Sequence, residues 1–371
     1  MNRNPQKKIA LLTNSFHTGG GLEHIYQIVR NLPEFQFAVF GKGGEDYQKF
    51  RDLPHVQVID SGYSPSLIEV YQPDLVHIHH LKPLLNLLGA PFRSYPFPII
   101  FTIHGVHLHK YEFLSGIRHQ LSFQLRFRLE RYLYRKVNKL ITVSADDQEF
   151  VRQTYAVDHL IYIPNGLDFE QINPQSLPSR QEIRQQLSLS NSAFAFLTIA
   201  RFDFAKGYDV LIKSLIRQRK ELLRENCRFL FLGNGADRKN VQRQIQRFDL
   251  DELVIFIDPE YPNYHLLKAS DAFILPSRWE GLPLTLLEAG AFSLPVLASE
   301  TYGIRTIIQH QKNGLLFKNQ NSSDLGQLLM WTLNNRDQFK RMGTQLSEDV
   351  RKNYDLKNTI ELLRSVYCSL L

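Results

Sequence analysis

Two positively charged residues stand close together in the stretch 200–207, Ala-Arg-Phe-Asp-Phe-Ala-Lys-Gly. Arg201 and Lys206 follow the apolar run Phe194–Ile199 and precede a helical pattern that starts at Gly207. Fixed cations beside the free amide groups of a helix N-terminus suit a diphosphate. An exposed loop that carries an arginine and a lysine is equally consistent with these residues alone.

A second pattern is a pair of glutamates with Glu-x₇-Glu spacing, Glu280 and Glu288. Glu280 lies in a loop after the apolar run Ala272–Leu275, and Glu288 lies in a helix that we expect to contain Pro283 in its first turn. Glu288 stands among leucines and alanines, and a buried carboxylate in so apolar a helix needs a partner. Sugar hydroxyls would provide one, whereas an exposed helix face is the alternative.

A third pattern is the run of three glycines, Gly19, Gly20 and Gly21, which follows the first strand candidate and opens a helix. Glycine lets the backbone approach a ligand closely, and a helix N-terminus offers its amides to an anion. The run is therefore a candidate phosphate cradle, with a tight strand-to-helix turn as the alternative. Its spacing differs from Gly-x-Gly-x-x-Gly, which argues against a nicotinamide dinucleotide.

The elements that must position these residues alternate along the whole chain. The strand candidates are Lys8–Thr13, Phe35–Phe40, Val56–Ile59, Leu75–Ile78, Ile99–Ile103, Lys139–Val143, Leu160–Ile163, Phe194–Ile199, Phe229–Leu232, Val254–Ile257, Ala272–Leu275 and Pro295–Ala298. Continuous apolar strands separated by helices, such as 22–32, 207–223 and 284–291, predict parallel sheets covered on both faces. Two such series predict two doubly wound α/β domains, and ligands bind at the carboxyl ends of the strands in such sheets.

The composition fits a folded protein of this size. The chain has 371 residues, of which 43% are hydrophobic and 22% charged, and its formal net charge is +7. This balance permits an anionic ligand, an acidic membrane surface or nucleic acid, but a nucleic-acid recognition motif is absent from the sequence. Cys227 and Cys368 lack the spacing of a disulfide framework or a cysteine zinc site. Every apolar run is far shorter than the roughly 20 residues that span a bilayer, so we expect any membrane contact to be peripheral.

The ordered set of motifs resembles the family 4 retaining glycosyltransferases of the GT-B fold, also called glycosyl transferases group 1. The resemblance covers nearly the whole chain and extends to the segments 74–79, 101–105, 141–144, 163–168 and 231–235. It implies two facing doubly wound Rossmann-like domains and a C-terminal crossover helix. We expect an acceptor-side domain at 1–175, a nucleotide-sugar-binding domain at 176–354, and a helix at 355–371 that returns to the first domain.

The resemblance also implies a role for each matching residue. Arg201 and Lys206 would hold the donor diphosphate, and Glu280 and His104 would lie beside the donor sugar. The implied donor-binding residues are Gly20, Gly21, Gly233, Leu282, Pro283, Leu284 and Glu288, the last of which would bind the ribose hydroxyls.

The implied reaction moves a sugar from a nucleotide diphosphate, UDP or GDP, to an acceptor hydroxyl with retention of the anomeric configuration. We expect this reaction to need no cofactor and no metal, and to serve surface polysaccharide or lipopolysaccharide synthesis. A nucleotide-sugar epimerase or hydrolase of the same fold is an alternative, and a non-catalytic accessory subunit is another.

The histidines allow a different interpretation. His77 and His79 share one strand face, and His80, His104, His107 and His109 lie in nearby loops. Imidazoles can hold zinc, but the sequence near them offers no acidic ligand pattern, and we predict no metal site. We also predict no metal site at Asp249-Leu250-Asp251, which we interpret as a solvated turn.

The segment 108–140 carries eight lysines and arginines but two glutamates, with apolar residues interleaved. A basic amphipathic helix can lie on an anionic membrane, which would suit a lipid-linked acceptor. A packed helix with a basic outer face is the alternative. We predict a cytoplasmic protein, at the inner face of the membrane if this segment binds lipid.

Overall fold

The computed structural model describes residues 6–17, 19–44, 46–89 and 94–371; Thr18, next to the glycine run, lies outside them. The chain forms two compact units, which are unit 1 (Met1–Asn165 and Leu356–Leu371) and unit 2 (Gly166–Asp355). Segment 166–175 thus belongs to unit 2, although the sequence placed it in the first domain. The reason is local bonding, since Leu167 N donates to Tyr354 O at 2.8 Å and Lys268 Nζ donates to Pro174 O at 2.8 Å.

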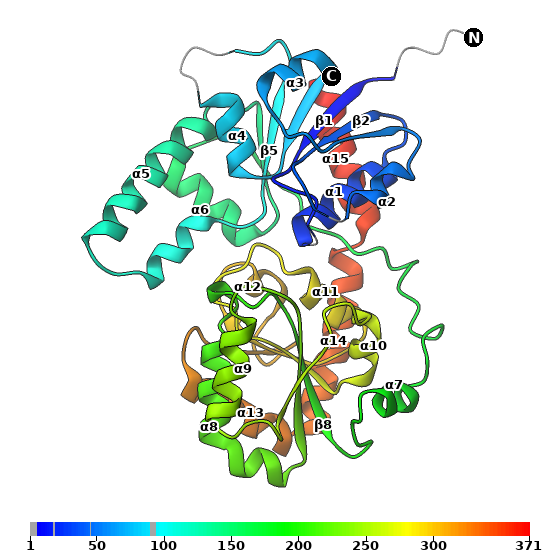
Figure 1. Ribbon diagram of the computed structural model, residues 1–371, viewed down its shortest axis with the longest axis vertical. Coiled ribbons are helices and arrows are strands. Elements are labelled where there is room, and N and C mark those ends of the chain that lie inside the picture. Colours follow the sequence, from blue (N-terminus) through cyan, green and yellow to red (C-terminus); the bar gives the residue numbers. More distant parts are fainter. Residues whose placement is uncertain (1–5, 18, 45, 90–93) are drawn as a thin grey trace. The chain divides into compact units, whose positions relative to one another are not determined.

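Unit 1 is built on a seven-stranded parallel sheet with the order β3-β2-β1-β4-β5-β6-β7. Figure 1 shows helices packed around its strands. Its strands are β1 (Lys8–Leu12), β2 (Gln36–Phe40), β3 (Val56–Ile59), β4 (Leu75–Ile78), β5 (Ile99–Ile103), β6 (Lys139–Thr142) and β7 (Leu160–Tyr162). The order reverses between β1 and β4, which pair in register from Ile9 with Leu75 to Leu12 with Ile78. The carboxyl ends of strands at such a reversal are where this kind of sheet binds ligands.

The helices of unit 1 cover both faces of that sheet. They are α1 (Gly20–Asn31), α2 (Gln48–Arg51), α3 (Pro65–Tyr71), α4 (Leu81–Leu88), α5 (Ile117–Tyr134), α6 (Ala145–Tyr155) and α15 (Leu356–Leu370), with the 3₁₀ helix η1 at His107–Phe113. One apolar core joins the sheet to α1 and α15, and a second joins it to α4, α5 and α6. The C-terminal helix α15 is therefore part of unit 1, and its Tyr367 hydroxyl lies 2.7 Å from Nδ1 of His77 in β4.

Unit 2 contains a six-stranded parallel sheet with the order β10-β9-β8-β11-β12-β13. The strands are β8 (Phe194–Ile199), β9 (Cys227–Leu232), β10 (Val254–Phe256), β11 (Ala272–Leu275), β12 (Val296–Glu300) and β13 (Leu315–Lys318). The sequence did not predict β13, a strand of four residues at the edge of the sheet. The site elements of this unit follow β8 and β11, which are neighbours in the sheet.

The helices of unit 2 are α7 (Arg180–Gln186), α8 (Tyr208–Arg224), α9 (Arg238–Arg247), α10 (Asn263–Ala269), α11 (Leu284–Ala291), α12 (Ile304–Ile307), α13 (Ser322–Asn334) and α14 (Arg336–Asn353), with the 3₁₀ helix η2 at Phe204–Lys206. An apolar core joins α8, α9 and α13 to the sheet. Pro283 does not lie in the first turn of α11 as predicted; it is the N-cap, and the helix begins at Leu284. None of the helices in the described part of the chain is both long and apolar enough to cross a bilayer.

Candidate active site

A buried ion pair forms at the carboxyl end of the unit 2 sheet. Lys206 follows β8, Glu280 follows β11, and Lys206 Nζ donates to both carboxylate oxygens of Glu280 at 2.6 and 2.8 Å. Ser277 Oγ donates to Glu280 Oε1 at 2.7 Å. The side chains of Lys206 and Glu280 are 17% and 9% exposed, so each charge has a close partner where water is scarce. The structure thus brings together two residues that the sequence predicted for the site.

The turn that carries Lys206 has a specific backbone. Gly207 has a φ of 64°, in the left-handed region that favours glycine, and links η2 to α8. A Cβ added to Gly207 would lie 2.0 Å from the carbonyl oxygen of Pro276. The Lys-Gly sequence therefore lets the loop after β8 lie directly against the loop after β11.

Arg201 occupies the start of the same loop but is not part of the ion pair. Its Nη2 lies 3.0 Å from Asp203 Oδ2, and its side chain is 70% exposed. Gly233, after β9, has a φ of 147°, and a Cβ there would lie 2.1 Å from the carbonyl oxygen of Ala200. Gly233 is thus required by the close approach of two backbone segments next to Arg201.

The remaining predicted residues of unit 2 lie at the start of α11. Leu282 is buried, Pro283 caps the helix, and Leu284 begins it. Glu288, in the second turn, is half-buried rather than on an exposed helix face. The preceding loop is fixed by Gly303, whose φ is 75° and where an added Cβ would lie 1.8 Å from the carbonyl oxygen of Gly281.

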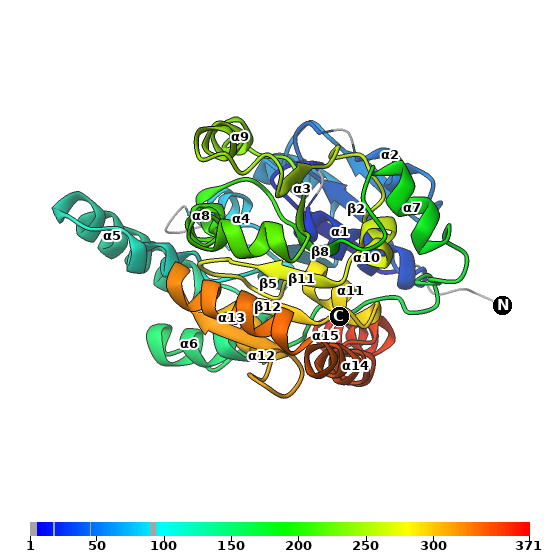
Figure 2. The same cartoon turned by 90° about the horizontal axis from the view of Figure 1, so that it is seen from below.

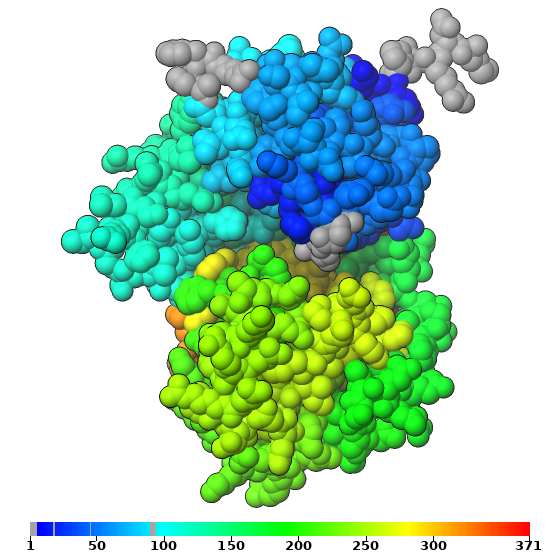
Figure 3. All heavy atoms as spheres, viewed as in Figure 1, coloured from blue at the N-terminus to red at the C-terminus, as the bar shows by residue number. Residues whose placement is uncertain are grey.

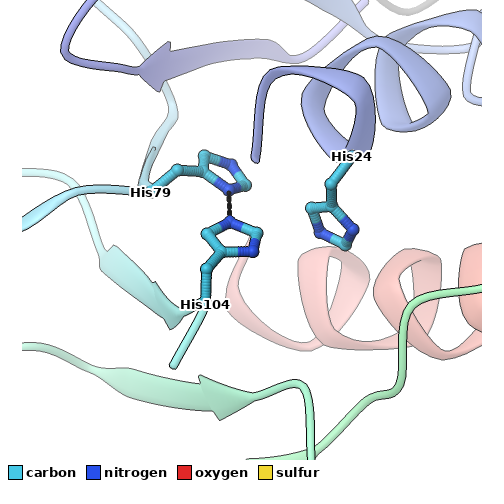
Figure 4. Close-up of side chains that lie close together, drawn as sticks. All are labelled: His24, His79 and His104. Carbon is cyan, nitrogen blue, oxygen red and sulfur yellow. Dashed lines mark hydrogen bonds between the residues drawn. The ribbon is translucent and has the colours of Figure 1, made fainter. Parts of the chain in front are cut away.

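Histidines gather at the carboxyl ends of β4 and β5 in unit 1. His79 follows β4, His104 follows β5, and His24 comes from α1; their rings point toward one another (Figure 4). His79 Nδ1 and His104 Nε2 share a hydrogen bond of 3.1 Å. The His24 and His104 ring centroids are 5.0 Å apart. The sequence found His79 and His104 but missed His24, because a lone histidine in an amphipathic helix carries no pattern of its own.

These imidazoles are held in the neutral form. Burial lowers the pKa of His24 and of His80 to about 4. Burial also lowers the pKa of His79 and of His104 well below 6.5, and repulsion from neighbouring imidazoles lowers both further. At neutral pH this end of the sheet therefore presents uncharged hydrogen-bonding groups.

The cluster also has the ligand chemistry for a transition metal. One ring nitrogen from each of His24, His79 and His104 lies within 4.8 Å of the others, and in the described residues this is the one group of three or more such side chains. Nε2 of His79 is buried and has no hydrogen-bond partner among the described residues, while His24 has Asn165 as a hydrogen-bonding neighbour. Neutral imidazoles are the form that binds zinc. If a metal binds to unit 1, we expect it between these three rings.

The glycine run lies beside this cluster. Helix α1 begins at Gly20 with Gly19 as its N-cap. A Cβ added to Gly21 would lie 3.6 Å from the His80 ring and 3.9 Å from Cδ2 of His104, which is ordinary contact. The structure therefore brings Gly21 and His104 together, and space for a side chain remains at Gly21.

Other histidines named by the sequence lie elsewhere. His109 is buried, its Nδ1 lies 2.9 Å from Glu112, and its Nε2 lies 3.5 Å from Asp147. His107 is exposed at the start of η1. Asp249 and Asp251 belong to the turn between α9 and β10.

Two family models match most of the chain. The model "Glycosyltransferase Family 4" matches residues 18–171, and "Glycosyl transferases group 1" matches residues 179–349. Among curated proteins, the chain is 26% identical over 271 residues to the UDP-Gal:alpha-D-GlcNAc-diphosphoundecaprenol alpha-1,3-galactosyltransferase of Escherichia coli, covering 68% of this chain and 66% of that enzyme. The chain matches 57% to 66% of the length of the first three curated relatives.

Solved structures share the fold over almost the full length. Sucrose-phosphate synthase from Thermosynechococcus elongatus superposes with a TM-score of 0.83 at 19% identity, covering 98% of this chain and 99% of that one. Anabaena HepE in complex with UDP-glucose gives a TM-score of 0.82 at 19% identity, covering 98% and 100%. The predicted GT-B fold of two doubly wound Rossmann-like domains is confirmed. The chain therefore belongs to the glycosyltransferases, with a family 4 domain followed by a group 1 domain.

Proposed function

We propose that this glycosyltransferase moves a sugar from a nucleotide diphosphate sugar to an acceptor hydroxyl, with the donor on unit 2 and the acceptor on unit 1. The observation that carries this proposal is the buried pair of Lys206 and Glu280 at the carboxyl ends of β8 and β11. A solved structure with the same fold is a complex with UDP-glucose, which supports a UDP-sugar as the donor.

In this proposal Lys206 stabilises the leaving group. As the bond from the anomeric carbon to the diphosphate oxygen lengthens, negative charge grows on the diphosphate, and a cation already held in place stabilises that charge without reorganisation. Arg201 is exposed and can turn toward the same diphosphate. Glu280 holds the Lys206 ammonium in place before and during transfer and lies beside the sugar.

We further propose that the anomeric configuration is retained by attack on the face that the leaving group departs from. A covalent glycosyl intermediate would need a free carboxylate at the anomeric carbon. Glu280 does not offer one, because Oε1 accepts from Lys206 and Ser277 and Oε2 accepts from Lys206. The departing phosphate oxygen would then take the acceptor proton. The configuration of the product, measured by proton NMR, tests this step, and an inverted product would contradict it.

Transfer in this proposal needs no metal ion. The carboxylate nearest the proposed leaving group, Glu280, is occupied by a lysine and a serine, and the positive charge that a metal would supply comes from Lys206. We expect full activity after dialysis against a chelator. If activity falls and returns with added metal, the cluster of His24, His79 and His104 becomes the first place to look for the ion.

One experiment separates the possible reactions. The protein is mixed with a panel of UDP- and GDP-sugars, and nucleotide release is followed with and without glycan or lipid-linked acceptors. Acceptor-dependent release supports transfer, and release without acceptor favours a hydrolase. An epimerase would convert the donor into its epimer with no net release of nucleotide, which chromatography of the nucleotide sugar detects. A protein that binds donors but neither releases nucleotide nor changes the donor would be an accessory subunit.

We also propose that α5 contacts an anionic membrane, at the cytoplasmic face where lipid-linked acceptors would be met. Its inner side is anchored by buried Glu130, which accepts hydrogen bonds from Arg126 Nε and the Tyr155 hydroxyl. Its outer side exposes Ile117, Leu121 and Leu125, one turn apart, with 75%, 66% and 72% of each residue exposed. Figure 2 shows α5 extending away from the strands of unit 1, and in Figure 3 the atoms coloured as this part of the chain protrude at the left of the view.

Charge favours a bilayer as the partner of this face. Arg118, Arg128, Arg131 and Arg135 are exposed on or next to α5, while its glutamate, Glu130, is buried. The apolar and basic residues of α5 are interleaved on its exposed side, so that leucines could enter a bilayer while the arginines meet phosphate headgroups.

Vesicle binding tests this contact. Replacing Arg128, Arg131 and Arg135 with glutamate should lower partition onto phosphatidylglycerol vesicles at least about 100-fold, because each basic residue contributes about 1 kcal/mol near such a surface. The matched control reverses Lys239, Arg243 and Arg247 on α9, another basic helix face, and should leave partition unchanged. Equal partition of the α5 variant and the parent would contradict the proposal, and self-association through α5 would indicate a second copy as its partner.

A further inference from the structure

A buried arginine that the sequence analysis did not single out lies between Ser277 and the predicted site residue Glu280. Arg278 follows β11 and is 5% exposed, so its charge needs partners. Nη2 donates to both carboxylate oxygens of Asp209 at 2.9 Å, and Nη1 donates to the carbonyl oxygen of Phe204 at 2.6 Å. The guanidinium carbon lies 4.0 Å from the centre of the Phe204 ring, and Nε donates to Gln320 Oε1 at 3.3 Å.

The backbone N–H and carbonyl groups of Arg278 are also hydrogen-bonded. Its N–H donates to the carbonyl oxygen of Ala205 at 2.7 Å. Its carbonyl oxygen accepts from Thr301 Oγ1 at 2.7 Å and from Asn319 Nδ2 at 2.8 Å. Arg278 itself follows β11, and these partners follow β8, β12 and β13. One residue therefore links the loops after four adjacent strands of the sheet.

Lys206 lies inside the part of the loop that Arg278 holds. Phe204 and Ala205 precede Lys206, Asp209 in the first turn of α8 follows it, and all three bond to Arg278. Glu280, which receives the Lys206 ammonium, lies two residues after Arg278. The distance between the loops that carry Lys206 and Glu280 is therefore set in large part by one guanidinium group.

We propose that Arg278 is a positioning residue for sugar transfer, which fixes the Lys206 ammonium where the leaving diphosphate will need it. The inference rests on the function proposed above. A guanidinium suits this role because its planar fork gives several hydrogen bonds in fixed directions, which a lysine ammonium cannot reproduce. Displacing a catalytic group by about 1 Å can cost roughly 100-fold in rate.

The same unit offers a matched arginine at the opposite end of the same two strands. Arg184 is 1% exposed, and its Nε and Nη1 donate to the carbonyl oxygens of Ser190 and Ala269 at 3.2 Å each. It also donates to Ala193 O and pairs with Asp271 at 3.4 Å. These partners precede β8 and β11, whereas those of Arg278 follow strands. Both arginines are buried among carbonyl oxygens and one aspartate, but Arg278 alone of the two contacts the Lys206 loop.

The test compares Arg278→Met with Arg184→Met at a temperature where circular dichroism shows both folded. Both variants should have a lower melting temperature. In Arg278→Met we expect kcat to fall about 10- to 100-fold with a much smaller change in KM for the donor, because positioning matters most in the transition state. In Arg184→Met we expect kcat within about twofold of the parent protein, since that arginine only stabilises the fold.

Two further variants keep the test decisive if Arg278→Met does not fold. Arg278→Lys keeps the charge but loses the fork, and Asp209→Asn keeps the shape but loses the ion pair; both should lower kcat, with Asp209→Asn the milder. Normal kcat in both, or an equal loss in Arg184→Met at matched stability, would overturn the inference.

Parent protein and Lys206→Ala are measured in the same series. If the parent transfers sugar, Lys206→Ala is strongly impaired, and the Arg278 variants keep the kcat of the parent, then the positioning role alone is wrong. If the parent transfers no sugar from any donor, the proposed function fails, and the inference fails with it.

Discussion

The two sheets differ in the kind of side chain that is buried at their carboxyl ends. In unit 2, Lys206 and Glu280 form an ion pair at 2.6 and 2.8 Å. In unit 1, His24, His79 and His104 are gathered without an acid, and burial lowers the pKa of all three. Lysine and glutamate titrate far from neutrality, so burying them requires a partner, whereas a histidine can lose its proton at modest cost. The carboxyl end of the unit 2 sheet thus holds a paired cation, and that of the unit 1 sheet holds uncharged hydrogen-bonding groups.

The largest expected effect comes from removing the charge in unit 2. Lys206→Ala should lower the transfer rate about 10²- to 10³-fold, because the leaving diphosphate loses a fixed cation and Glu280 is left buried without its partner. The measurement is acceptor-dependent nucleotide release. Lys220→Ala, an exposed lysine of α8, is the control and should behave as the parent does. Near-normal turnover of Lys206→Ala would remove this residue from the site.

A smaller loss of activity is expected from substitutions in unit 1, because they remove a neutral hydrogen bond and not a charge. His104→Gln keeps an uncharged donor and acceptor but displaces them, and should lower kcat about tenfold, since one hydrogen bond contributes up to about 1.5 kcal/mol. His104→Phe removes both groups and should be more severe. Equal activity of these two variants would show that His104 acts only by filling space.

The stability of the two units should depend differently on pH. The folded-state pKa of His24 and His80 is about 4, below the unfolded value of about 6.5, so the unfolded chain binds more protons in between. Their contribution to stability is complete above about pH 6.5 and is lost as the pH falls toward 4. Each such histidine should lower the free energy of unfolding of unit 1 by about 2 kcal/mol as the pH falls from 6.5 to 5.

The chain allows this difference to be measured directly. Both tryptophans, Trp279 and Trp331, lie in unit 2, so tryptophan emission reports on unit 2 while circular dichroism reports on both units. When the pH is lowered from about 7 to about 5, the melting temperature measured by circular dichroism should fall more than the melting temperature measured by tryptophan emission. A pH-independent transition in unit 1 would mean that its histidines are not held neutral.

The smallest expected effect concerns donor affinity. Glu288→Gln should weaken nucleotide-sugar binding about five- to tenfold with little change in kcat, because a hydrogen bond from a hydroxyl to a charged acceptor is worth more than one to a neutral acceptor. Calorimetric titration with the donor measures this. Glu348→Gln, an exposed glutamate of α14, is the matched control. Unchanged donor affinity in Glu288→Gln would contradict the predicted ribose contact.

Much of the fold could be predicted because each strand carries its own signal. The strands Val56–Ile59, Leu75–Ile78, Ile99–Ile103, Phe194–Ile199 and Ala272–Leu275 have the predicted bounds. Apart from Gln57 in the edge strand β3, they are mainly apolar runs, which both faces of a buried parallel sheet require. Strand β13 was missed because its four residues end in an exposed lysine and follow a turn, so the run is too short to stand out.

The sequence by itself determined the two-sheet architecture and the types of residue at the strand ends, since apolar periodicity and turn residues are local properties. Only the tertiary structure decided which of those residues meet. Lys206 and Glu280 are 74 positions apart and touch because β8 and β11 are neighbours in the sheet. Arg278 becomes the link between four loops, and His24 joins His79 and His104, for the same reason. Contacts between distant loops depend on the order of strands in the sheet, and no local pattern in the sequence encodes that order.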